Sequence, residues 1–184
     1  GGAVYVDALS ICEIYNSIFT NNGAWNGGAI ATIGGGKLRI QGSYLSYNTA
    51  IGYNSLLANT TGASNVAVGN NALDANTTGD SNAAVGFSAL TSNTTGTNNT
   101  ANGYQSLYYN TTGASNTAMG KHALVANTTG ANNVAVGSLS LRDNTTAGDN
   151  VSIGDSAMLV NTTGAYNVAV GSHALDANTT AGRN

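Results

Sequence analysis

The chain has 184 residues, enough for one ordinary domain, and only 7% of them are charged. The net charge is −3 with five lysines and arginines together, so no basic surface exists that could neutralise nucleic-acid phosphates. Its apolar runs are too short to span a bilayer, its single cysteine cannot form an internal disulfide, and a hydrophobic content of 41% with so small a net charge excludes a disordered chain.

The first 47 residues carry a repeat with an offset of 26 residues. Gly1-Gly2-Ala3-Val4 returns as Gly27-Gly28-Ala29-Ile30, and Phe19-Thr20-Asn21-Asn22 aligns with Leu45-Ser46-Tyr47-Asn48. The stretches between them, such as 3–6 and 37–40, alternate or run apolar as β-strands do. We therefore predict that residues 1–47 form a larger-coil parallel β-helix segment with about three strands per turn.

Residues 48–184 contain eight copies of a 17-residue unit, without insertion or deletion. The consensus is N-(V/T)-A-(V/I)-G-x-x-(A/S)-L-x-x-N-T-T-G-A-x, and its positions are numbered 1 to 17 from Asn48. This unit is too short for a helical-pair repeat of about 33 residues. It suits one coil of a parallel β-solenoid, in which coils stack at the strand spacing of about 4.8 Å. The predicted fold is all-β, with a 48–184 solenoid that continues from the larger coils before it.

Each part of the unit has an expected role in the coil. Positions 2–4 form a strand that ends at the glycine of position 5, positions 8–9 start a second short strand, and positions 12–16 make the second corner. We expect the leucines of position 9, such as Leu73, Leu90, Leu107 and Leu124, to form the core with Val or Ile of positions 2 and 4, which would also supply any interface between chains. Alanine at position 3 points the opposite way. We expect the asparagines of position 12 to stack as hydrogen-bonded amide ladders; they are Asn59, Asn76, Asn93, Asn110, Asn127, Asn144, Asn161 and Asn178.

Two families resemble these repeats. The N-V-A-V-G-x-x-A-L core resembles the head repeats of trimeric autotransporter adhesins, and the unit at 48–62 looks like arrays in bacterial and phage tail-fibre-like surface proteins. That resemblance covers residues 48–184 and implies a left-handed roll that assembles as a trimer. G-G-A-(V/I) with F-x-x-N in residues 1–48 resembles the repeats of polymorphic outer-membrane proteins, which implies a right-handed parallel β-helix.

No constellation for chemistry is found in the sequence. His122 and His173 share a repeat position but lie three coils apart, so they cannot hold one metal ion within a chain. The carboxylates fall at several repeat positions and form no calcium-binding ladder. Gly34-Gly35-Gly36-Lys37 lacks the spacing of a phosphate-binding loop, and Cys12 lies in an apolar stretch typical of a buried small side chain. We therefore expect no enzyme, no catalytic residues, no metal and no cofactor.

Two surface features remain open from sequence alone. Every Asn-Thr-Thr matches a glycosylation sequon, although an asparagine ladder without modification explains the same residues. Exposed aromatic side chains at coil corners could stack on sugars or on a host surface; the candidates are Tyr53, Phe87, Tyr104, Tyr108 and Tyr109.

The sequence thus predicts an extracellular structural or adhesive fibre, on a bacterial cell surface or a phage, that assembles as a homo-oligomer. A host surface or glycan is its expected ligand, and neither nucleic acid nor a membrane span is expected. One alternative is the subunit of an end-to-end filament, since uncapped coils expose strand edges. Another is an ice-binding solenoid with the threonines of position 13 in one column, although the second threonine of each pair would then face the other way.

Overall fold

The computed structural model describes residues 48–184 throughout and, in the first 47 residues, the backbone of six short strands. These six are β1 (Val4–Val6), β2 (Ile11–Tyr15), β3 (Ile18–Phe19), β4 (Ile30–Thr32), β5 (Lys37–Gln41) and β6 (Tyr44–Leu45). The 17-residue repeats supply one strand each: β7 (Thr49–Ile51), β8 (Val66–Val68), β9 (Ala83–Val85), β10 (Thr100–Asn102), β11 (Thr117–Met119), β12 (Val134–Val136), β13 (Val151–Ile153) and β14 (Val168–Val170).

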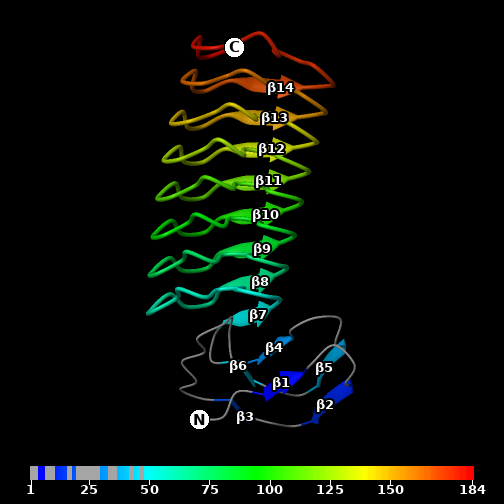
Figure 1. Ribbon diagram of the computed structural model, residues 1–184. Helices are drawn as coiled ribbons and strands as arrows, with labels where there is room; N and C mark the ends of the chain where they lie inside the picture. The colour runs from blue at the N-terminus through cyan, green and yellow to red at the C-terminus, as the bar shows by residue number, and fades with distance from the viewer. Residues whose placement is uncertain are drawn as a thin grey trace.

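The first six strands pair in parallel as β1 with β4, β2 with β5 and β3 with β6. All three pairs have an offset of 26 residues, as in Val4 opposite Ile30 and Ile11 opposite Lys37, which is the period of the sequence repeat. Three strands therefore make up one turn of this segment. Strand β4 contacts β7 (Figure 1), where the two kinds of coil meet. The domain boundary after residue 47 stays a prediction.

The strands of residues 48–184 form a single eight-stranded parallel sheet in the order β7 to β14. Neighbouring strands pair at an offset of 17 residues, so that Ala67 lies opposite Ala84 and Ala101 opposite Ala118. Each repeat is therefore one coil, and the coils stack into a straight rod (Figure 1). This arrangement confirms the predicted all-β parallel solenoid.

The core differs from the expected one. Position 3 is inside: Ala67, Ala84 and Ala118 are fully buried, and so are the leucines of position 9 and the small residues of position 8 in the inner coils, as at Leu107 and Ser106. The valines and isoleucines of positions 2 and 4 lie on the opposite face, which is partly or largely exposed. The prediction that they line the core was wrong, because the space between the strand and the opposite corner is narrow and holds leucine with only a methyl group across from it.

Positions 8 and 9 form no second strand in the described coils, which is a second correction. The leucine of position 9 instead has a left-handed backbone, with φ of 51° at Leu107, and so have positions 7 and 17. Its N–H still bonds to the next coil, as from Leu107 to the carbonyl of Ala123 at 3.0 Å. Seventeen residues with one three-residue strand close into a ring only through such tight turns, so non-glycine residues occupy a backbone conformation that they ordinarily avoid.

Candidate interaction surface

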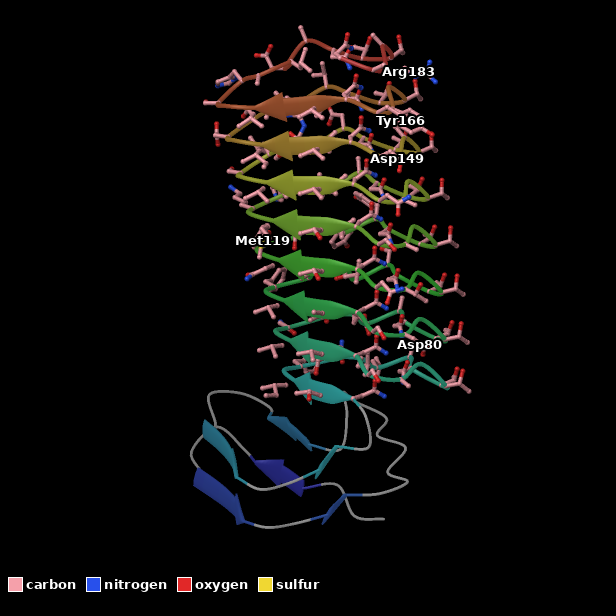
Figure 2. All side chains as sticks on the ribbon, turned by 180° about the vertical axis from the view of Figure 1, so that it is seen from behind. Asp80, Met119, Asp149, Tyr166 and Arg183 are labelled. Carbon is pink, nitrogen blue, oxygen red and sulfur yellow. The ribbon has the colours of Figure 1, made fainter. Side chains whose placement is uncertain are left out.

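The outer face of the eight-stranded sheet is a regular surface that extends from β7 to β14. Strands place positions 2 and 4 on the same side, so each coil contributes two outward side chains, and those of neighbouring coils align in two columns. Several are well exposed, including Ile51 at 41%, Met119 at 42% and Val170 at 67%. Figure 2 shows Met119 on the side of the rod where the arrowheads of the strands lie. Asp80, Asp149, Tyr166 and Arg183 lie on the opposite side (Figure 2).

This face carries no charge within residues 48–184. The column of position 2 contains valine, threonine and alanine, and that of position 4 contains valine, isoleucine, methionine and one asparagine, Asn102. The acidic and basic residues of the repeats occupy positions 6, 10, 11, 16 and 17; examples are Lys121, Arg142 and Asp149. An uncharged apolar strip beside polar corners is the pattern of a surface that packs against another one.

A signal for this orientation exists in the sequence. Position 3 holds only alanine and one serine, whereas positions 2 and 4 tolerate threonine, asparagine and methionine. A position restricted to the smallest side chains is a crowded one, and positions that accept different sizes and polarities face open space. The hydrophobicity of valine and isoleucine concealed this difference.

Stacking between neighbours covers part of the aromatic corner. The rings of Phe87 and Tyr104 lie parallel, with centroids 5.4 Å apart, and Tyr104 packs at the same distance against the tilted ring of His122. Stacking thus covers one face of each of these two rings, and Phe87 and Tyr104 are 45% and 46% exposed. Tyr108 and Tyr109 meet edge to face at 4.7 Å. Of the five predicted surface aromatics, Tyr53 and Tyr109 are the most exposed, at 52% and 55%.

The asparagines of position 12 are stacked and inaccessible in the inner coils. Asn93, for example, is completely buried, and its Nδ2 donates to Oδ1 of Asn76 at 2.9 Å and to the carbonyl of Gly96 at 3.0 Å. The nitrogen that would carry a sugar therefore already has two acceptors inside the folded rod. This geometry contradicts glycosylation of the folded inner coils.

Threonine side chains form two different columns. At position 13 the hydroxyl donates to the carbonyl of the same position in the next coil, as from Thr94 to Thr111 at 3.1 Å. At position 14 the side chains are exposed throughout the eight coils, as at Thr95. The column expected to bind ice thus uses its hydroxyl groups to hold coils together, and a single exposed column remains beside it.

The histidines stand apart from each other and from any cluster of ligands. His122 bonds to Oε1 of Gln105 at 3.0 Å, and His173 lies 3.3 Å from a carboxylate oxygen of Asp176. Burial lowers the pKa of His122, and the positive charges of Lys121 and Arg142 lower it further. Within the described residues no three metal-ligating side chains converge.

Several sequence predictions fall outside the described part. The side chain of Cys12 and the residues Gly34 to Gly36 lie there, so the structure adds nothing to what the sequence says of them. Among the described residues no helix has the length and apolar character needed to cross a bilayer.

The comparisons with known proteins identify no relative. No family model matches the chain, and neither a curated protein nor a solved structure is significantly similar to it.

Proposed function

We propose that this chain is a segment of an extracellular structural fibre that works by association with copies of itself and not by catalysis. The observation that carries the proposal is the outer sheet face, which is uncharged along all eight coils and apolar over most of its length. Seven of its sixteen outward side chains are apolar and 39–67% exposed, and they are spread from β7 to β14, which suits an interface of the standard size of roughly 800 Å² per partner.

The recurring polar and glycine positions of the repeat connect the coils and make the rod stiff. Asparagine of positions 1 and 12, threonine of position 13 and glycine of position 5 occur in every coil, and each holds neighbouring coils together or turns the chain at a corner. A rod held by identical hydrogen bonds at each level suits a spacer or stalk. The sequence resemblance to adhesin heads and tail-fibre arrays supports a trimer on a bacterial surface or a phage.

An adhesive role, with a glycan or host surface as ligand, belongs to the same proposal. It rests on the exposed aromatic side chains, chiefly Tyr53 and Tyr109, because Phe87 and Tyr104 each have one ring face covered by the other. An end-to-end filament stays an alternative, distinguished by a mass that grows with concentration.

The test is the mass of the chain in solution. We expect light scattering to give three chains for the wild type, and a double substitution of Val134→Ser and Val136→Ser to give single chains with an unchanged circular dichroism spectrum. Both valines lie on the outer face, so their loss removes packing between chains and leaves the core intact. Val125→Ser with Val160→Ser, off that face, is the matched control and should keep the trimer. A monomeric wild type at micromolar concentration would contradict the proposal.

A further inference from the structure

The outer column of position 4 has a single polar member. It runs Ile51, Val68, Val85, Asn102, Met119, Val136, Ile153 and Val170 from β7 to β14. Asn102 is exposed on β10, and its side chain makes no hydrogen bond to the other residues that the structure describes. The outward residue beside it on β10 is Thr100, and the next strand carries Thr117. Asn102, Thr100 and Thr117 therefore form one polar spot in a strip whose other side chains are apolar apart from Thr49 on β7.

Asparagine is self-complementary. Its side-chain carbonyl accepts hydrogen bonds and its amide donates them, so two copies of the same asparagine satisfy each other. A copy of this chain arranged around an axis parallel to the rod brings its own Asn102 to the same height. A copy shifted by one coil would instead set Asn102 against Val85 or Met119 and bury an unpaired amide, which costs roughly 1–3 kcal/mol per group.

The outward residues of the other repeats do not fix the register between neighbouring chains. Coils have the same length and nearly the same outward residues, so an apolar strip of this kind packs almost equally well after a shift of one or two coils. A single buried asparagine fixes register and oligomeric state in coiled coils for the same reason. A repetitive interface needs one irregular position to align its copies.

We propose that Asn102 sets the register and the parallel direction of neighbouring copies, through a hydrogen bond between Asn102 side chains across the interface. The inference rests on the proposed assembly through the sheet face. It assigns to the face a defined partner, namely a second copy of this chain aligned coil by coil. A parallel arrangement in register is the one that pairs Asn102 and also covers all eight strands.

The test measures distances between identical nitroxide labels on neighbouring chains. Labels are placed on cysteine at Thr78→Cys or at Thr163→Cys, both exposed at position 14 and five coils apart, in a Cys12→Ser background. For chains with Asn102 we expect one narrow distance distribution, with the same mean at both sites. Asn102→Val should keep the assembly but broaden the distribution, with added components from shifts of about 4.8 Å along the rod.

The variant is compatible with folding, because valine occupies position 4 in β8, β9, β12 and β14. Asn70→Val, an exposed asparagine off the sheet face, is the control and should keep the narrow distribution. A narrow distribution in an assembled Asn102→Val variant would overturn the assignment of register. Different means at the two labelled sites of the chain with Asn102 would overturn the parallel direction. A chain that is monomeric with Asn102 in place would instead refute the proposed assembly itself.

Discussion

The amide of Asn110 donates a hydrogen bond of 2.8 Å to Oδ1 of Asn93, seventeen residues earlier, and both side chains are completely buried. The same Nδ2 donates to the carbonyl of Gly113 at 3.0 Å, and Oδ1 of Asn110 accepts from Asn127 at 2.8 Å. Each amide is thus satisfied by the coil before it, its own corner and the coil after it. The thin core of this rod is therefore partly polar, and its polar groups hold each coil in register with the next.

This ladder predicts a pH-dependent defect in Asn110→Asp. A carboxylate there faces two acceptors, Oδ1 of Asn93 and the carbonyl of Gly113, without a proton to donate, so we expect a loss of about 3 kcal/mol or more of unfolding free energy at pH 7. The folded state then favours the protonated acid, which raises its pKa above the unfolded value. The stability deficit should shrink as the pH falls toward about 4.

Urea unfolding of wild type and variant at the two pH values measures this effect. Asn98→Asp is the matched control, because position 17 is exposed and carries aspartate naturally at Asp149. An Asn110→Asp deficit that is equal at both pH values would show that the lost amide donor alone, and not the buried charge, sets the cost.

Crowding at the glycine of position 15 predicts that an alanine there lowers stability, and that a second substitution at the next residue restores it. A Cβ at Gly113 would lie 2.4 Å from both Oδ1 of Asn110 and the carbonyl oxygen of Gly130, so we expect Gly113→Ala to cost about 1–3 kcal/mol. Ala147 nevertheless occupies position 15 of another coil, where Gly148 follows it. In that coil the crowding is at position 16, since a Cβ on Gly148 would lie 2.7 Å from the carbonyl oxygen of Ala131.

Adding Ala114→Gly to Gly113→Ala should therefore recover most of the lost stability, because the pair then has the order found at 147–148. Thermal unfolding of the two single variants and the double variant gives the coupling between the two positions. Additive losses would mean that the two orders are not interchangeable between coils.

Much of the fold could be predicted because the constant length of the repeat fixes which residues of neighbouring coils lie opposite each other. The 17-residue spacing of asparagine implies both the coil and the ladder, and the glycine of position 5, with φ of 139° at Gly103, marks a corner. Hydrophobicity did not predict which face of the strand packs against the core. Val134 and Ala135 are both apolar, and only the available space decides which side chain turns inward. The left-handed backbone at Leu107 was also hidden, because leucine ordinarily avoids it and only ring closure imposes it.

The left-handed corner at position 17 predicts opposite effects for two substitutions of Ser115, which is exposed with φ of 58°. Asparagine tolerates this conformation best among side chains and occupies the position at Asn98 and Asn132. We expect Ser115→Asn to raise the unfolding free energy by about 0.5 kcal/mol and Ser115→Val to lower it by about 1–2 kcal/mol. Urea denaturation of the three proteins measures both, and a stabilising valine would contradict the strained corner.

The surroundings of His122 predict a pKa that responds to one neighbour. Because burial and the charges of Lys121 and Arg142 lower it, protonation is disfavoured in the folded state, and the stability that the neutral ring retains is lost as the pH falls below about 6.5. Removing one positive charge in Lys121→Ala should raise the pKa of His122. Titration of the ring protons by NMR measures the shift, and an unchanged pKa would leave burial and the charge of Arg142 as its causes.

The leucine column predicts the largest loss from a purely apolar change. Leu107 is fully buried in the fourth of eight coils, in a core made of alanines and the position 9 column, so the cavity left by Leu107→Ala has little around it that can collapse. We expect a loss of about 2–5 kcal/mol in unfolding free energy. Lys121→Ala, at an exposed corner, should change stability by less than about 0.5 kcal/mol. Chemical denaturation of both variants gives the comparison, and similar midpoints for the two would show that the leucine column does not hold the middle of the rod together.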